Sequence, residues 1–230
     1  MTPGTNGAGY PATGSPGRAP AGSIELLPGT DEITLRLVGQ FSRTGIFERA
    51  ALVVIDVQKA IDHPTWGVRN NPQAEQNIAA LLAHWRKKAR PIYHVRHDSV
   101  EPASHYRPGQ AGHDFKPEAL PAQGEIVIAK RTNSAFIGTD LEHRLRAAGI
   151  AVLVVAGVIT SNSVEATVRM AGNLGFETYL VEDATFTFGR KDWNGAFRTA
   201  DEVHALSLAN LDGEYCTVTR TADVLAVAES

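Results

Sequence analysis

The chain has 230 residues with 22 basic and 25 acidic side chains, so its net charge of −3 offers no electrostatic attraction to a nucleic acid or an anionic membrane. About 43% of the residues are hydrophobic, which is typical of a globular protein with a large buried core. The single cysteine, Cys216, excludes an internal disulfide framework and a cysteine-rich metal site. We therefore expect a small-molecule ligand, with no nucleic acid and no membrane as partner.

The first 49 residues differ in composition from the rest. Residues 1–22 contain six Gly and four Pro, which predicts a flexible tail. Residues 23–49 are richer in hydrophobic side chains and predict an ordered lead-in segment. No signal-peptide pattern and no apolar run long enough for a membrane span is found, so we expect a cytoplasmic protein. Residues 50–230 are expected to form one domain.

Six short apolar runs in this domain predict six β-strands, and amphipathic segments between them predict helices. The runs cover residues 51–56, 91–96, 125–129, 152–156, 178–181 and 215–219. Strands that alternate with helices are typical of an α/β protein in which helices cover both faces of a parallel sheet. We therefore predict a three-layer α/β/α fold.

Local signals predict where several helices begin and end. Gly149 predicts the end of one helix, because glycine readily adopts the left-handed conformation that stops a helix. Three pairs of residues have the spacing of N-terminal caps or first-turn signals: Asn71 with Pro72, Thr139 with Glu142, and Thr199 with Glu202.

Several common catalytic motifs are absent from the sequence. It has no GxGxxG after a strand, no GxxxxGK[ST], no GxSxG and no HExxH. These absences argue against a dinucleotide-dependent oxidoreductase, a P-loop NTPase, a common serine esterase and a zinc protease of that type. We expect no cofactor.

Two charged residues directly follow apolar strands. Asp56 ends the first run and Lys130 follows the third. A buried strand end disfavours an unpaired charge, so Asp56 either caps a turn or is held by a cation, and Lys130 either reaches the surface or enters a site. If the two strands were neighbours, Asp56 and Lys130 would face each other across one crevice, where open parallel sheets bind ligands.

The segment after the fourth strand carries a third candidate. Asn162 and Glu165 have capping-box spacing, which places Ser163 at the first position of the following helix. Free backbone N–H groups and the positive end of the helix dipole would stabilise an oxyanion there. The alternative is that Ser163 is only a favourable residue for starting a helix.

Three stretches together resemble the isochorismatase-like hydrolase superfamily, also called the cysteine hydrolases. They are VVIDVQ, AKRTNSAFIGTDL and GVITSNSVEATVRMAGNLGFETYLVEDA, and the resemblance covers residues 50–220. It implies a six-stranded parallel sheet of strand order 3-2-1-4-5-6 and a homo-oligomer. It leaves the substrate open.

The resemblance also implies roles for individual residues. Asp56 would be the general base, Lys130 the cation that orients it, and Ser163 the occupant of the nucleophile position. A cis peptide bond between Val158 and Ile159 would direct backbone N–H groups into an oxyanion hole.

Ser163 departs from the pattern of the amidases in this superfamily, which have cysteine at that position. A hydroxyl is far harder to ionise than a thiol, so the cysteine mechanism cannot be transferred whole. Four possibilities follow: Asp56 acts with water on an amide or an enol ether, Ser163 is itself the nucleophile, the protein binds without catalysis, or Ser163 replaces an original cysteine.

Other residues near the predicted strand ends are candidates for binding. We expect the substrate pocket to be lined by Gln58, Trp66, Tyr106, Phe136, Val158, Ile159 and Asn162. A lid or subunit contact is expected from Phe186, Phe188 and Trp193. His94 and His97 would point to opposite faces of a strand, so we expect no metal site.

Overall fold

Six parallel strands form the centre of the computed structural model, which describes residues 46–227. Their order in the sheet is β3-β2-β1-β4-β5-β8, and they cover Ala51–Ile55 (β1), Ile92–His97 (β2), Ile126–Lys130 (β3), Val152–Val158 (β4), Glu177–Phe186 (β5) and Thr217–Thr219 (β8). β8 is the sixth strand of this sheet along the chain, because β6 (Arg190–Lys191) and β7 (Phe197–Arg198) form a separate antiparallel pair. The predicted order 3-2-1-4-5-6 is therefore confirmed.

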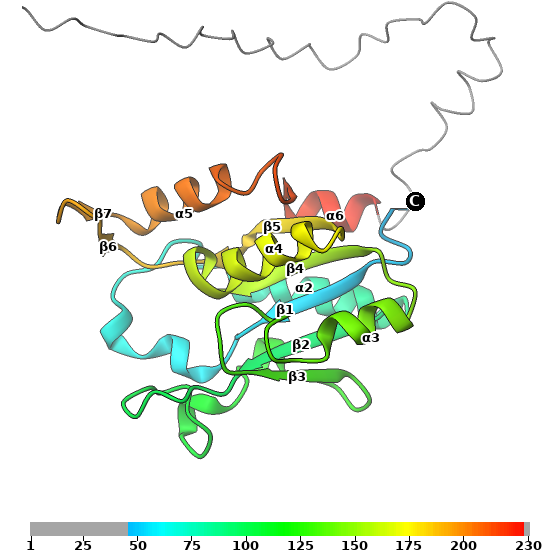
Figure 1. Cartoon of the computed structure of the whole chain (residues 1–230), viewed down its shortest axis with the longest axis horizontal. Helices are drawn as coiled ribbons and strands as arrows, with labels where there is room; N and C mark the ends of the chain where they lie inside the picture. Colours follow the sequence, from blue (N-terminus) through cyan, green and yellow to red (C-terminus); the bar gives the residue numbers. More distant parts are fainter. Residues whose placement is uncertain (1–45, 228–230) are drawn as a thin grey trace, which may run out of the picture. The chain divides into compact units, whose positions relative to one another are not determined.

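Helices cover both faces of the sheet, which confirms the three-layer α/β/α prediction (Figure 1). They are α2 (Ala74–Lys87), α3 (Leu141–Ala147), α4 (Glu165–Asn173), α5 (Ala200–Ala209) and α6 (Thr221–Val227). Helices α2 and α6 pack on one face, and α3 and α4 pack on the other. None of the helices in this part of the chain is long and apolar enough to cross a membrane.

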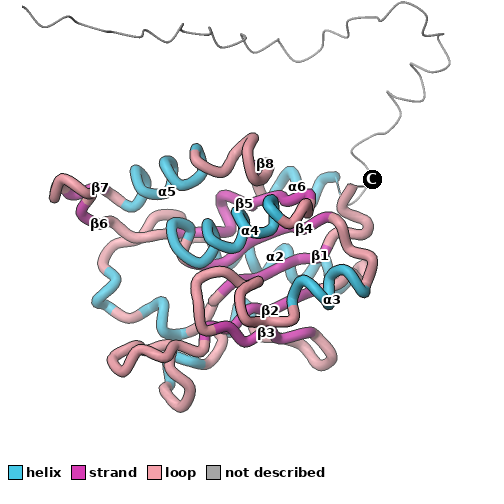
Figure 2. Tube along the Cα trace, in the orientation of Figure 1, coloured by secondary structure: helices cyan, strands magenta, loops and turns pink. Residues whose placement is uncertain are grey.

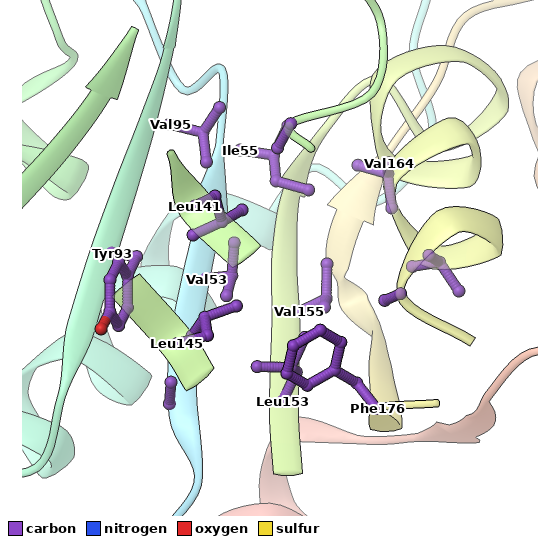
Figure 3. Packing of buried hydrophobic residues seen from close by; sticks show 14 of the residues in the cluster. Val53, Ile55, Tyr93, Val95, Leu141, Leu145, Leu153, Val155, Val164 and Phe176 are labelled. Atoms are coloured by element: carbon purple, nitrogen blue, oxygen red, sulfur yellow. The ribbon is translucent and has the colours of Figure 1, made fainter. Parts of the chain in front are cut away.

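The central strand β1 shows why the sheet is covered on both sides. Val53 and Ile55 belong to the hydrophobic cluster under α3 and α4, whereas Leu52 and Val54 belong to the cluster under α2. All five residues of β1 are buried, as expected for a strand in a parallel sheet, where both faces meet helices. Figure 3 shows the first of these clusters, with Val53 and Ile55 facing Leu141 of α3 and its neighbours.

The cap predictions have mixed outcomes. Thr199 and Glu202 form the predicted capping box at the start of α5. Gly149 has φ 67° and follows α3, which confirms the predicted end of that helix. Thr139 forms no capping box with Glu142, and the N-cap of α3 is Asp140; the Thr139 hydroxyl donates to the carbonyl of Ala135 and accepts a long hydrogen bond (3.4 Å) from the N–H of Leu141.

Asn71 does not begin α2, which starts three residues later at Ala74. Its side chain instead donates to the carbonyls of Glu182 (2.9 Å) and Thr185 (2.7 Å) on β5. These long-range hydrogen bonds, which local spacing cannot reveal, tie the segment before α2 to the sheet, and Asn71 has a positive φ of 44°.

The predicted strands 178–181 and 215–219 differ most in extent from those observed, since β5 runs from Glu177 to Phe186. The sixth predicted strand, 215–219, is shorter than expected, and Cys216 lies just before β8 rather than in it. The predicted tail 1–22 and residues 23–45 of the lead-in segment lie outside the described residues. Its last residues, 46–49, form a turn in which Phe47 is buried against Tyr179.

The segments that follow the carboxyl ends of β1 and β2 lie at the same end of the sheet (Figures 1 and 2). They are built from turns and from four short 3₁₀ helices: Lys59–Asp62, Pro64–Trp66, Ala111–His113 and Pro117–Ala119. Because parallel strands end together, this edge is where the polar residues at strand ends meet.

Gly157 of β4 has a backbone conformation that a side chain would disturb. Its φ is 121°, and a Cβ added there would lie 2.5 Å from the backbone nitrogen of Ile55. We expect Gly157→Ala to lower the free energy of unfolding by about 3 kcal/mol or more, because backbone strain and overpacking add. Urea denaturation measures this change.

The matched control for this prediction is Gly175→Ala. Gly175 also has a positive φ, of 80°, but an added Cβ would meet no atom within 4 Å. We expect Gly175→Ala to lower the free energy of unfolding by about 1 kcal/mol, because only the cost of the left-handed conformation applies there. Equal losses for the two variants would contradict the steric account of Gly157.

Candidate active site

Asp56 lies directly after β1, at the point where the chain turns away from the sheet. Its backbone N–H still donates to the carbonyl of Val95 (2.9 Å), and its carbonyl accepts from Gln58 (2.8 Å). Asp56 has φ 54°, in the left-handed region that Asp adopts more readily than most residues. The carboxylate is 4% exposed and is therefore held inside the protein.

Lys130, the last residue of β3, meets this carboxylate from two strands away. Their strands are not neighbours, because β2 lies between β1 and β3, in agreement with the predicted strand order. The long lysine side chain spans that distance, and its Nζ donates to Asp56 Oδ2 at 2.6 Å. The pair is buried, with Lys130 only 1% exposed.

The ammonium of Lys130 has three N–H donors and three close oxygen partners. Besides Asp56, Nζ donates to the carbonyl of Thr132 (3.1 Å) and to Ser163 Oγ (3.2 Å). His97 Nδ1 lies somewhat farther away, at 3.5 Å. Lys130 thus hydrogen-bonds to both the Asp56 carboxylate and the Ser163 hydroxyl, which occupies the nucleophile position that the resemblance implies.

The Asp56 carboxylate experiences two opposing effects. Burial raises its pKa, because it penalises the charged form, whereas the Lys130 ammonium and, to a smaller extent, the Ser163 hydroxyl lower it. The net direction is upward. Only Oδ2 is hydrogen-bonded, since Asp56 Oδ1 is buried without a hydrogen-bond partner among the described residues.

Ser163 lies in a π-helical turn, Thr160–Val164, that links β4 to α4. The predicted capping box is wrong, because α4 begins at Glu165 and Asn162 makes no side-chain cap. Ser163 therefore precedes α4 instead of occupying its first position. The peptide bond between Val158 and Ile159, just before this turn, is cis, as the resemblance implies.

Buried hydrogen bonds hold the π-helical turn at both ends. Thr160 is fully buried, and its Oγ1 lies 3.0 Å from Nδ1 of His204, a buried residue of α5. At the other end, Thr167 Oγ1 donates to the carbonyl of Ser163 (2.7 Å) and accepts from the backbone of Ala135 (3.0 Å). The position of Ser163 is therefore fixed by elements on either side of it.

A cavity of about 140 Å³ opens beside these residues. Its lining includes Asp56 and Ser163, and five of the seven predicted binding residues: Trp66, Tyr106, Val158, Ile159 and Asn162. Val158 and Tyr106 belong to a small hydrophobic cluster, with Ile159 packed against it. The lining thus combines apolar side chains with the polar groups of Asp56 and Ser163.

Two of the predicted binding residues do not line the cavity. Gln58 is fully buried and bonds to backbone, accepting from the N–H of His97 (2.7 Å) and donating to the carbonyl of His113 (2.9 Å). Phe136 stacks on Phe176 in the core under α4, with ring centroids 5.8 Å apart. Gln58 therefore fastens the loop after β2, and Phe136 contributes to packing.

Three residues that line the cavity were not predicted: His97, Ser104 and Asn133. His97 ends β2, the strand between β1 and β3, so the strand order implied by the resemblance could have identified it. Burial, followed by the charge of Lys130, lowers the pKa of His97 to about 4, and its ring is neutral at neutral pH. Ser104 and Asn133 lie on loops, where no pattern in the sequence indicates that a residue lines the cavity.

The expectation of a lid from Phe186, Phe188 and Trp193 is wrong for its two phenylalanines. Phe186 is fully buried and Phe188 is 8% exposed, and both belong to the hydrophobic cluster behind the cavity. Phe188 stacks on Trp66, with ring centroids 5.6 Å apart. Trp193 is fully exposed between β6 and β7.

The histidines and the cysteine lie outside any metal-binding arrangement. His94 bonds to Glu125 (2.7 Å), whereas His97 faces Lys130, so the two rings point to opposite faces of β2 as expected. In residues 46–227 no group of three or more His, Cys, Asp or Glu side chains could hold a metal ion. Burial raises the pKa of the Cys216 thiol to about 12, and Cys216 does not line the cavity.

This chain is similar to a known family model and to known proteins. The family model described as the isochorismatase domain matches residues 50–223. The isochorismatase family protein YrdC of Bacillus subtilis is 42% identical over 174 residues, which is 76% of this chain and 93% of YrdC. Nicotinamidase 3 of Arabidopsis thaliana is 28% identical over 70% of this chain and 80% of its own length.

A solved structure supports the same relationship. The crystal structure of an isochorismatase-family protein from Chromobacterium violaceum matches with a TM-score of 0.78 and 64% sequence identity. The match covers 79% of this chain and 94% of the other.

The low pKa of His97 predicts how stability depends on pH. Unfolded histidine binds a proton below pH about 6.5, whereas folded His97 stays neutral down to about 4. Between these values the unfolded state binds more protons, so the free energy of unfolding falls as the pH falls. Over this pH range we expect the free energy of unfolding of His97→Gln to fall by about 1 kcal/mol less than that of the wild type, allowing for solvent screening.

Urea denaturation at several pH values measures this difference. The matched control is His143→Gln, because His143 lies exposed on α3. If the free energy of unfolding changed with pH by the same amount in the wild type and in His97→Gln, the low pKa of His97 would be ruled out.

Proposed function

The chain belongs to the isochorismatase family of hydrolases, and we propose that it hydrolyses a small molecule in the cavity beside Asp56. Asp56 and Lys130 would be the acid–base pair, with Ser163 at the nucleophile position. The observation that carries this proposal is the buried contact of 2.6 Å between Asp56 and Lys130, with Ser163 Oγ 3.2 Å from the same ammonium. The bond cleaved would be the carbon–nitrogen bond of an amide or the carbon–oxygen bond of an enol ether.

For an amide, the proton transfers would run through Asp56. The carboxylate takes a proton from the attacking water as the water oxygen bonds to the carbonyl carbon. The same proton then passes to the departing nitrogen when the carbon–nitrogen bond breaks. An upward-shifted pKa suits a carboxyl that must both accept and return a proton.

Lys130 would keep its charge beside the reacting groups throughout this sequence. Its ammonium stabilises the Asp56 carboxylate before the proton transfer and the developing negative charge afterwards. It also donates to Ser163 Oγ, so negative charge on that oxygen would be stabilised as well.

Ser163 could act in two ways. In the first, water attacks the substrate directly and Ser163 only contacts the oxyanion. In the second, Asp56 takes the proton of Ser163 as the serine oxygen bonds to the carbonyl carbon, and this proton passes to the departing nitrogen when the carbon–nitrogen bond breaks. Water then hydrolyses the acyl adduct and regenerates the Ser163 hydroxyl. Cys216 cannot substitute as the nucleophile, because its thiol has a pKa of about 12 and lies outside the cavity.

We expect Asp56→Asn to lower the turnover of any accepted amide or enol ether by about 10²–10⁴-fold, because the proton acceptor is lost while the shape is kept. Hydrolysis assays across both substrate classes measure this effect. The matched control is Asp140→Asn, which removes an exposed carboxylate paired only with Arg144 on α3 and should leave turnover unchanged. Full activity of Asp56→Asn would reject the acid–base role of Asp56, whereas no turnover of either substrate class by the parent protein would favour a binding protein on this fold.

Variants of Ser163 separate the remaining possibilities. Ser163→Ala abolishes turnover if the hydroxyl is the nucleophile, and mass spectrometry should then detect an acyl adduct in the parent protein. If water attacks directly, Ser163→Ala retains substantial activity and no adduct forms. A Ser163→Cys variant with much higher amidase activity would indicate that serine stands in for an original cysteine.

A further inference from the structure

His204 connects α5 to the turn that carries Ser163. We propose that His204 is a positioning residue for the hydrolytic site: its neutral ring accepts a hydrogen bond from Thr160 at Nδ1 and so fixes the turn that holds the Ser163 hydroxyl beside Lys130. This proposal rests on the proposed function, because it concerns the residue at the nucleophile position of that site.

The turn from Thr160 to Val164 needs support from outside itself. It is a π-helical turn, a geometry that is rare and mostly limited to single turns. Its own hydrogen bonds include a long one, 3.3 Å from the N–H of Val164 to the carbonyl of Ile159. Thr160 begins the turn and Ser163 lies three residues later, so a shift of Thr160 would also move the Ser163 hydroxyl.

His204 supplies that support at the start of the turn. Thr160 is fully buried and His204 is 6% exposed, so bulk water does not compete for the bond of 3.0 Å between Thr160 Oγ1 and His204 Nδ1. Without the ring, a buried hydroxyl would lose its partner, which is unfavourable. The start of the turn would then shift until the hydroxyl found another partner.

A bulge in β5 brings Glu182 to the far side of the ring. Between the partner pairs Val155–Leu180 and Gly157–Thr185, β4 advances by two residues and β5 by five. Glu182 is one of the extra residues of β5, and its carboxylate lies 3.8 Å from the His204 ring. His204 thus joins an irregular segment of the sheet to the turn that follows β4.

The far side of the ring also indicates which nitrogen carries the proton. His204 Nε2 lies 3.5 Å from Asn71 Nδ2, but both N–H groups of that amide already donate to the carbonyls of Glu182 and Thr185. The ring hydrogen-bonds to the backbone of Glu182 instead. The proton therefore lies on Nε2, and Nδ1 accepts from the Thr160 hydroxyl.

The ring is neutral at neutral pH. Burial is the largest effect and lowers the pKa of His204, whereas the charge of Asp201 and the backbone of Glu182 act in the raising direction. The net direction is downward. The Glu182 carboxylate also pairs with Arg220 at 3.0 Å, so the His204 ring is not its closest partner.

Alkylation of the thiol in Ser163→Cys by iodoacetamide reports on the surroundings of this position. The reaction requires the thiolate, so its rate as a function of pH gives the pKa of the thiol. We expect Lys130, whose Nζ is 3.2 Å from Ser163 Oγ, to hold this pKa below the ordinary value of about 8.5. The parent protein measures the background from Cys216, which is small because burial raises the pKa of that thiol to about 12.

Two substitutions of His204, made in Ser163→Cys, distinguish the two ring nitrogens. The amide of Asn lies near the Nδ1 position of histidine, and the amide of Gln lies near the Nε2 position. We expect His204→Gln to slow alkylation at pH 7 by about tenfold, because a thiol displaced from Lys130 has a pKa about one unit higher. We expect His204→Asn to keep most of the rate, because it still pairs with Thr160.

A variant of the partner completes the test. Thr160→Val removes the hydroxyl and keeps the shape, so it should slow alkylation as much as His204→Gln does. The two substitutions together should be no worse than either alone, because both remove the same interaction.

The matched control is His94→Asn, also made in Ser163→Cys. His94 is another buried histidine, and its ring bonds to Glu125 at 2.7 Å instead of to the turn. This variant should lower the free energy of unfolding and leave the thiol pKa unchanged. A second measurement needs no variant: long-range ¹H–¹⁵N NMR correlations of the parent protein should show His204 in the neutral form with the proton on Nε2 at pH 7.

Several results would overturn the proposal. They are an unchanged thiol pKa in His204→Gln, equal slowing by His204→Asn or His94→Asn, and a proton on Nδ1 of His204 at pH 7. A lowered thiol pKa that does not respond to His204 would overturn this proposal and leave the proposed function standing. An ordinary thiol pKa in Ser163→Cys would count against the proposed function, and the positioning role would then stand only if His204→Gln, and not His204→Asn, changes the alkylation rate.

Discussion

The buried contact between Asp56 and Lys130 is the interaction on which the site depends. Removing two opposite charges from water is costly, and their attraction compensates only when the geometry is close and the remaining donors are satisfied. The 2.6 Å contact and the two further partners of the Lys130 ammonium, Thr132 and Ser163, meet this requirement. The pair therefore also sets where the Ser163 hydroxyl lies.

The architecture of the sheet brings these groups together. β1, β2 and β3 are parallel, so the residues at their carboxyl ends, Asp56, His97 and Lys130, reach the same edge. β2 separates the two charged residues, and only a side chain as long as lysine bridges it. Helices pack on both faces of these strands, and Gly157 lies against the backbone of Ile55, the residue before Asp56.

The placement of Asp56 and Lys130 could be predicted because each lies at the carboxyl end of a predicted strand, Asp56 directly after β1 and Lys130 as the last residue of β3. Asp56 and Lys130 are charges at the ends of apolar runs, a pattern that local sequence displays. His97 was missed because its own strand looks like an ordinary amphipathic one, and its role in lining the cavity arises from the neighbouring strands. Phe136 was misplaced because an aromatic residue on a loop near a strand end can equally well pack into the core.

The wrong predictions of helix caps have a similar origin. Asn71 and Thr139 have the spacing of helix caps, yet Asn71 bonds to β5, and Thr139 donates to the carbonyl of Ala135 without forming a capping box. Cap spacing describes what a residue can do locally, and tertiary contacts decide among the options. Only the capping box at Thr199 formed as predicted.

Carbon-13 NMR of Asp56 across a pH titration tests the central claim most directly, because it reports the protonation of the carboxylate itself. The account predicts a pKa above the ordinary value for aspartate, and a further rise in Lys130→Met, where the opposing charge is gone. An ordinary pKa that Lys130→Met does not change would contradict it.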